Sequence, residues 1–388
     1  MGKKETSDNG KWKGLAAAAF CLLIVVTVLY AMAAVRLYAD KNTVAPSVQP
    51  DGQETLEISG LEALSMWNEG HGARDALIEY VEAVTDESNP DFIPVDRRIA
   101  VFDFDGTLFC ETDPNYFDYT MLVYRVLEDP DYVDLASDFE REVANDIVAL
   151  NETGTASADL PVRHGMAVAS AFAGMTIEEF DDYIRVFSEQ AMPSYTGMNR
   201  GYGFYLPMIQ IIDYLETNDF TVFIISGTDR LIVRSIVECY GLDIPNSRII
   251  GSDELIIASG QGDEDGLDYR FTADDTPILG GEFLRKNLQE NKVEIIVREI
   301  GLQPVLSFGN SSGDYSMATY TVNNNPYRSL AFMLCCDDLV RENGNLDKAD
   351  KMYAACDENG WIPVSMADDW NTIYGPSVVY TGATVTAD

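Results

Sequence analysis

The chain has 388 residues, enough for one large domain or two ordinary domains with a sizeable core. Hydrophobic residues make up 46% and charged residues 23% of the sequence, which is typical of a folded protein and excludes a disordered one. The 64 acidic residues outnumber 26 basic residues, for a formal net charge of −38. Because this charge repels the phosphates of nucleic acids and attracts cations, no nucleic-acid partner is expected.

An apolar run without charged residues covers residues 15–35. At about 1.5 Å per residue in a helix, this run matches a hydrocarbon core of about 30 Å. Four lysines precede it and only two basic residues follow closely, so the positive-inside rule leaves the N-terminus cytoplasmic. We therefore expect residues 1–36 to form a cytoplasmic stub and a membrane anchor, with the catalytic domain on the extracytoplasmic side. A cleaved signal peptide is the alternative, because residues 31–33 offer an Ala-Met-Ala cleavage site, and the protein would then be secreted.

Residues 37–56 are polar and contain two prolines and a glycine, so they are expected to form a linker. The spacing of apolar residues then predicts helices within 63–85, 116–127, 139–150, 176–192, 206–218, 229–241 and 292–301. Apolar runs predict strands at 97–105, 220–227, 247–255, 303–311 and 329–337, with a hairpin within 255–271 that turns on its glycines. Strands that alternate with helices indicate a parallel sheet with helices on both faces.

Three of the predicted strands end in small or polar residues, in the stretches DFDGT (103–107), SGT (226–228) and GNSSGD (309–314). Ligands of such sheets bind outside the carboxyl ends of the strands, so these stretches are expected to meet at one edge. A hard divalent cation such as Mg²⁺ offsets the repulsion between two neighbouring aspartates there. The same cation neutralises a phosphoryl group that an anionic nucleophile must approach.

With a later lysine, these stretches resemble, in order, the four motifs of the haloacid dehalogenase (HAD) superfamily over roughly residues 98–338. They are most similar to its phosphoserine-phosphatase-like members. The resemblance implies an α/β fold, with a Rossmann-like parallel-sheet core formed by 57–110 and 206–388 and a helical C1-type cap formed by 111–205. It also implies a Mg²⁺-dependent phosphomonoester hydrolase that acts on a small phosphorylated substrate.

By this resemblance, Asp103 is the nucleophile that forms an aspartyl-phosphate. Asp105 is the acid that protonates the leaving alcohol and then the base that activates water. Two neighbouring carboxylates suit these roles, because one can stay ionised while the other keeps its proton. The family's dehalogenases lack the second aspartate, so its presence favours phosphoryl chemistry. The lysine that offsets negative charge is expected at Lys292, with Lys286 as the alternative.

The resemblance places phosphate binding at Ser226, Gly227 and Thr228, through a hydroxyl and backbone N–H groups. Ser226 would equally suit the N-cap of the helix that follows. The further substrate-binding candidates are Thr107 in the first motif and Arg230 and Arg234, which share one helix face.

The expected metal ligands are Asp103, Asp105, Asn310 and Asp314. Asn310 departs from the family pattern, which has an acid there. Its amide oxygen can still ligate Mg²⁺, but the site loses one negative charge. This departure suggests an alternative, a catalytically weak phosphoester-binding protein or sensor. A phosphotransferase is a further alternative, in which an alcohol acceptor takes the phosphoryl group.

Tyr116 and Tyr119 follow the first motif with a spacing that suits one helix face. They are candidates for an aromatic cage around a quaternary ammonium, as in phosphocholine, through cation–π contacts. Ordinary packing in the core is the alternative. Stretches on both sides of the core also resemble exported HAD proteins related to phosphorylcholine phosphatase.

Overall fold

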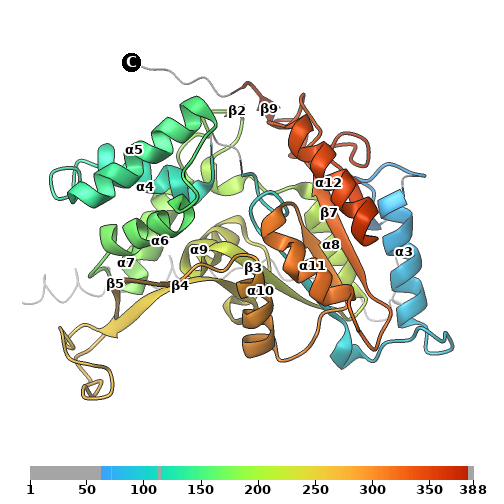
Figure 1. Cartoon of the computed structure of the whole chain (residues 1–388), viewed down its shortest axis with the longest axis horizontal. Helices are drawn as coiled ribbons and strands as arrows, with labels where there is room; N and C mark the ends of the chain where they lie inside the picture. The colour runs from blue at the N-terminus through green and yellow to red at the C-terminus, as the bar shows by residue number, and fades with distance from the viewer. Residues whose placement is uncertain (1–62, 71, 112–114, 383–388) are drawn as a thin grey trace, which may run out of the picture. The chain divides into compact units, whose positions relative to one another are not determined.

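A seven-stranded sheet runs through the residues that the computed structural model describes, 63–70, 72–111 and 115–382 (Figure 1). Its strands are β1 (Ile99–Phe102), β3 (Thr221–Asp229), β4 (Ile249–Ala258), β5 (Pro277–Arg285), β6 (Leu306–Gly309), β7 (Leu330–Cys335) and β8 (Ile362–Ser365). The spatial order is β5-β4-β3-β1-β6-β7-β8, and all neighbours are parallel except β4 and β5. The predicted α/β class with a mostly parallel sheet is therefore confirmed.

The central strand β1 is buried on both faces, because all four of its residues are apolar. Phe102 pairs with Phe308 in the neighbouring strand and their rings stack, with centroids 4.3 Å apart. Phe308 stacks in turn on Phe332 of β7 at 5.0 Å. This aromatic row joins three strands and holds their carboxyl ends at the same level.

Helices cover the two faces of this sheet. They are α3 (Gly72–Thr85), α8 (Leu206–Thr217), α9 (Arg230–Tyr240), α10 (Glu290–Ile295), α11 (Tyr315–Val322) and α12 (Leu346–Asn359). A π-helical turn, η4 (Ile296–Ile300), continues α10, and short 3-10 turns are η1 (Val95–Arg97), η2 (Arg200–Tyr202), η3 (Asn246–Arg248) and η5 (Ser312–Asp314). The side chains of β1 alternate between two apolar clusters, one with residues of α3 and α8 and the other with residues of α10 and α11. The expected helices on both faces are present.

In the described part of the chain between β1 and α8, four helices form a separate layer beside the β4–β5 edge (Figure 1). They are α4 (Phe117–Leu127), α5 (Asp138–Thr153), α6 (Leu160–Ala171) and α7 (Ile177–Ser188). Capping boxes start two of them, Ser137 with Glu140 and Thr176 with Glu179. The sequence does not single out α6, whose apolar residues lie nearly all around it.

The β4–β5 hairpin differs from the prediction, because its return strand begins only at Pro277. Asp275 accepts hydrogen bonds from the backbone N–H groups of Gly260 (2.8 Å) and Thr272 (2.7 Å), which closes a longer loop before the strands pair. The small strands β2 (Tyr195–Thr196) and β9 (Val379–Tyr380) form a second sheet. Two residues are too few for a periodic pattern, so the sequence predicts neither strand.

The expected membrane anchor or signal segment (1–36) and linker (37–56) lie outside the described residues. Among the helices that the structure describes, none is long and apolar enough to cross a membrane.

Candidate active site

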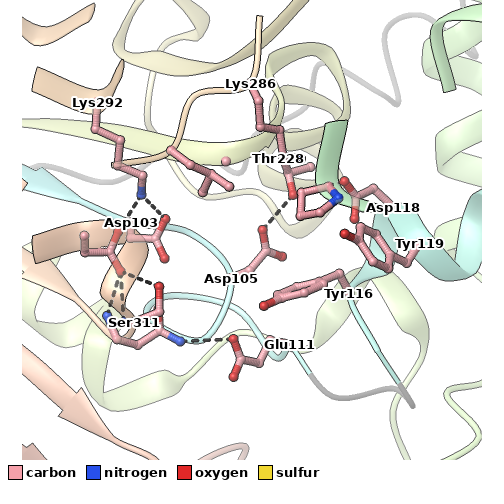
Figure 2. Close-up of a pocket in the computed structure, with 15 residues that line it drawn as sticks. Asp103, Asp105, Glu111, Tyr116, Asp118, Tyr119, Thr228, Lys286, Lys292 and Ser311 are labelled. Carbon is pink, nitrogen blue, oxygen red and sulfur yellow. Dashed lines mark hydrogen bonds and ion pairs between the residues drawn. The ribbon is translucent and has the colours of Figure 1, made fainter. Parts of the chain in front are cut away.

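A cavity of about 110 Å³ lies at the carboxyl ends of β1, β3 and β6 (Figure 2). It is lined by Asp103, Asp105, Glu111, Tyr116, Asp118, Tyr119, Pro161, Gly227, Thr228, Lys286, Leu288, Lys292, Asn310, Ser311 and Asp314. The three polar strand ends therefore meet, as the sequence predicts. The helical layer completes the cavity with residues from α4 and α6.

Lys292, in the first turn of α10, joins two carboxylates at the base of the cavity. Its Nζ lies 2.5 Å from Oδ1 of Asp103 and 2.6 Å from Oδ1 of Asp314. The lysine is only 1% exposed, so this ammonium group is held by the two carboxylates rather than by water. Burial, and then the charge of Asp314, raise the pKa of Asp103, while Lys292 opposes both. The structure thus brings Lys292, and not Lys286, against the expected nucleophile.

Both carboxylate oxygens of Asp314 have hydrogen-bond partners. Its Oδ1 meets Lys292, and its Oδ2 accepts hydrogen bonds from the backbone N–H groups of Asn310 (3.1 Å) and Ser311 (3.0 Å). A Cβ at Gly309 would lie 2.6 Å from that of Asp314, so only glycine allows the strand this close to the aspartate. The geometry gives Asp314 a positioning role toward Lys292 in addition to its expected role as a metal ligand.

Asp105 lies in a different environment from Asp103. The hydroxyl of Thr228 donates to its Oδ2 at 2.7 Å (Figure 2). Burial, followed by the charges of Asp118 and Asp103, raises the pKa of Asp105 well above its usual value. A carboxyl group that keeps its proton is what a general acid needs. Sequence reasoning did not single out Asp118, and only its position in the first turn of α4 beside Tyr119 could have suggested it.

The second motif forms the end of β3. Oγ of Ser226 accepts from the backbone N–H of Thr228 at 2.9 Å, and Nδ2 of Asn287 donates to the Ser226 carbonyl at 2.9 Å. Gly227 and Thr228 line the cavity, whereas Ser226 lies behind them. Thr107 is also outside the lining, with its hydroxyl 3.5 Å from Oδ2 of Asp103.

The N-cap of α9 is Asp229, whose side chain accepts from the backbone N–H of Leu231 at 2.8 Å. The alternative N-cap role for Ser226 is therefore wrong, because β3 continues to Asp229 before the helix begins.

The structure does not bring Arg230 and Arg234 to the cavity. Arg230 forms ion pairs with Asp253 (2.6 Å) and Glu299 (2.9 Å). Arg234 donates to the carbonyl of Ile249 at 3.1 Å. The side chains on this face of α9 point toward β4 and η4. The two arginines that we expected to bind substrate therefore bind groups of the protein itself, carboxylates for Arg230 and a backbone carbonyl for Arg234.

Tyr116 and Tyr119 line the cavity with their ring centroids 5.2 Å apart and their planes nearly perpendicular (Figure 2). Tyr119 is buried and packs on the ring of His164 at 4.2 Å. Oδ1 of Asp118 is buried beside them and has no hydrogen-bond partner within the described part of the chain. Lys286 also lines the cavity, and it forms no ion pair with another described residue.

The donor set around Asp103 fits a hard cation. Oδ1 of Asn310 is buried and finds no hydrogen-bond partner among residues 63–70, 72–111 and 115–382. Such an atom is costly unless an ion or water satisfies it. Carboxylate, carbonyl and amide oxygens are the ligands that Mg²⁺ takes. The described residues contain no group of three or more His, Cys, Asp or Glu that could hold a metal, so any ion here depends on the amide and backbone oxygens as well.

Comparison with known proteins agrees with the geometry of the cavity. The model of the haloacid dehalogenase-like hydrolase family matches residues 100–319, more than half of the chain. No curated protein matches. Similar solved structures include a protein of unknown function from Anaerococcus prevotii (15% identity, 76% of this chain and 91% of that chain, TM-score 0.45). They also include cytosolic 5'-nucleotidase IIIB bound to cytidine (11% identity, 76% of this chain and 86% of that chain, TM-score 0.45). A third is a phosphoserine phosphohydrolase-like protein from Francisella tularensis (16% identity, 61% of this chain and 87% of that chain, TM-score 0.33). These structural likenesses are too distant to carry an argument about function, but the family match covers every polar strand end that forms the cavity. The chain therefore belongs to the haloacid dehalogenase-like hydrolase family.

Proposed function

We propose that the protein is a Mg²⁺-dependent phosphomonoester hydrolase that works through an aspartyl-phosphate on Asp103. The observation that supports this most directly is the contrast between two carboxylates in one cavity. Lys292 pairs with Asp103. Among the described residues, the side chain of Asp105 has a hydrogen bond only from the hydroxyl of Thr228, and its charged neighbours are negative. One carboxylate is thereby suited to attack and the other to carry a proton.

In the first half of the reaction, an oxygen of Asp103 forms a bond to phosphorus and the bond to the leaving alcohol breaks. Asp105 gives its proton to that alcohol. In the second half, Asp105 takes a proton from water, which attacks phosphorus and releases phosphate from Asp103. Lys292 offsets the charge of the nucleophile throughout. The backbone N–H of Gly227, which lines the cavity, is suited to bind a phosphoryl oxygen.

The carboxylate of Asp103, the backbone carbonyl of Asp105 and Oδ1 of Asn310 would hold Mg²⁺, with Asp314 as the fourth ligand that the sequence predicts. The bound ion would neutralise the phosphoryl oxygens that the nucleophile approaches.

We further propose a substrate with a cationic leaving group, phosphocholine being the candidate. Tyr116 and Tyr119 present two rings at the side of the cavity that the helical layer closes, and cation–π contacts with such rings favour quaternary ammonium groups. The unpartnered Oδ1 of Asp118 adds negative charge beside these rings. Lys286 is the competing feature, because it would favour a leaving group that carries a carboxylate.

We also propose that residues 1–36 anchor the protein, with the catalytic part on the extracytoplasmic side. Protease added outside intact cells should remove a C-terminal epitope tag, and a protected tag would contradict this orientation.

The experiment for the enzyme is phosphate release from p-nitrophenyl phosphate and from a panel with phosphocholine, phosphoserine and nucleotides. Release should need Mg²⁺ and stop with EDTA. Stabilisation by a phosphoester without any release would instead support the binding protein or sensor. Transfer of the phosphoryl group to an added alcohol, in place of release, would support the phosphotransferase.

A further inference from the structure

Asn310 stands where the family pattern has an acid, and its amide is held in one orientation by Glu111. Nδ2 of Asn310 donates to Oε2 of Glu111 at 3.1 Å. A carboxylate only accepts hydrogen bonds, and Nδ2 is the only donor of the amide. If the amide were flipped, two acceptor oxygens would face each other, so Glu111 keeps Oδ1 on the opposite side.

Oδ1 of Asn310 is the oxygen that this arrangement leaves free for a ligand. It is buried, it has no hydrogen-bond partner among the described residues, and its side chain lines the cavity beside Asp103. A hydrogen bond from Nδ2 to a carboxylate also polarises the amide, which places more negative charge on Oδ1 and makes it a stronger ligand for a cation.

Glu111 itself is held in place by a second contact. Its Oε1 forms an ion pair with Nζ of Lys348, in the first turn of α12, and the carboxylate is only 12% exposed. The two oxygens of Glu111 thus have different partners, Lys348 on one side and Asn310 on the other. Rotation of the carboxylate would break both contacts.

The glycine of the first motif makes room for this pair. Gly106 has a φ of +75°, and a Cβ there would lie 1.9 Å from Nδ2 of Asn310 and 2.8 Å from Oε2 of Glu111. No side chain fits at this position while the hydrogen bond exists. The close approach of Asn310 and Glu111 therefore depends on a residue without a side chain at the turn after β1.

We propose that Glu111 is a positioning residue for the metal. It fixes the amide of Asn310 with Oδ1 toward the metal position. The inference rests on the proposed Mg²⁺ dependence, because it concerns how that ion is held.

The test is a double-mutant cycle on Mg²⁺ affinity, measured by titration calorimetry of the purified protein. Glu111→Met should weaken Mg²⁺ binding at least about tenfold, as loss of a group that orients a ligand does. In an Asn310→Ala background, Glu111→Met should weaken Mg²⁺ binding by less than about threefold, because Glu111 then has no amide to hold. Glu299→Gln removes one negative charge outside the cavity and should leave the affinity unchanged.

The combination Glu111→Gln with Asn310→Asp provides a rescue. The introduced glutamine can donate to the introduced carboxylate and accept from Lys348, so the total charge and both contacts are kept. We expect Mg²⁺ affinity within about threefold of wild type, and well above that of Glu111→Met.

An affinity that Glu111→Met leaves unchanged would overturn the inference. So would an equal cost in both backgrounds, which would mean that Glu111 acts directly, or a failed rescue in a protein that circular dichroism shows to be folded. If the wild type binds Mg²⁺ but the cycle shows no coupling, only this inference fails. If the wild type binds no Mg²⁺, the proposed metal dependence fails with it.

Discussion

Thr228 donates its hydroxyl hydrogen to Oδ2 of Asp105 at 2.7 Å, which ties the second motif to the expected acid across two neighbouring strands. The two residues are 123 positions apart in the chain. Their contact follows from the parallel pairing of β1 with β3, which brings both carboxyl ends to one edge of the sheet. The hydrogen bond orients Asp105 toward the cavity and lowers its pKa, against the larger effect of burial.

Removal of this hydrogen bond should impair catalysis without unfolding the protein. Thr228→Val keeps the shape of the side chain but leaves Asp105 without its donor. We expect kcat/KM to fall about tenfold, the typical effect of one hydrogen bond to a charged or reacting group. Thr228→Ser keeps the hydroxyl and should retain most activity. Equal losses in both variants would show that packing of the methyl group matters instead.

The two aspartates should respond differently to replacement by asparagine. Asp103→Asn removes the attacking oxygen anion, so turnover of every substrate should be lost while the fold survives. Asp105→Asn removes the proton donor, so poor leaving groups should slow by about 10²–10⁴ and p-nitrophenyl phosphate by less.

The Asp105→Asn protein should also accumulate phosphate on Asp103, because no group activates water. Mass spectrometry of the quenched protein after incubation with substrate and Mg²⁺ checks this. An adduct on any other residue, or full activity of Asp103→Asn, would refute the mechanism.

Lys286 and Arg230 form a matched pair of cations, one in the cavity and one outside it. Arg230→Ala should leave KM within about twofold, because the partners of Arg230 are Asp253 and Glu299, outside the cavity. Lys286→Ala should raise KM for phosphoserine at least about fivefold and change KM for phosphocholine little. Steady-state kinetics with both substrates distinguishes the effects of the two substitutions. If Arg230→Ala changed KM more than Lys286→Ala, this would contradict the position of Lys286 in the substrate cavity and of Arg230 outside it.

Tyr116 and Tyr119 give the test of a cationic leaving group. Tyr116→Leu or Tyr119→Leu removes the aromatic face but keeps apolar bulk. If an ammonium group binds there, kcat/KM for phosphocholine should fall at least about tenfold more than that for p-nitrophenyl phosphate. Similar losses on both substrates would indicate that the rings only pack.

Stability should depend on pH through Glu254, a buried residue of β4. Neither of its carboxylate oxygens has a hydrogen-bond partner in the described part, and burial, followed by the charge of Asp229, raises the pKa of Glu254 to about 9. The unfolded chain releases this proton near pH 4.5, whereas the folded protein keeps it until pH 9. The contribution of Glu254 to the free energy of unfolding is therefore fully present below pH 4.5 and is lost as the pH rises toward 9.

Glu254→Gln removes this dependence. The variant should match wild type near pH 4.5 and be more stable at pH 8, by on the order of 5 kcal/mol. Urea unfolding at several pH values measures the difference, and Glu282→Gln, at an exposed site on β5, is the control. A constant difference between Glu254→Gln and wild type across this range would mean that Glu254 is ionised in the folded protein.

The sequence by itself determined the fold class, the order of the motifs and the residues at the centre of the cavity. Asp103, Asp105 and Asn310 follow buried strands and Thr228 lies near the end of one, and the carboxyl ends of parallel strands must meet at one edge of a sheet. Local sequence patterns are therefore enough to predict a site residue where that residue lies at the end of a strand of the sheet.

Only the tertiary structure decided which other side chains reach that edge. Lys292 and Lys286 are six residues apart and both line the cavity, but only Lys292 forms an ion pair with Asp103 in the described part of the chain. Arg230 comes two residues after the second motif, yet its position on helix α9 directs it toward Asp253 and Glu299. Asp118 and Glu111 belong to no motif and enter the cavity because α4 and the turn after β1 pack there. The direction of a side chain on a helix or a loop depends on what that element packs against, and spacing along the chain does not contain this information.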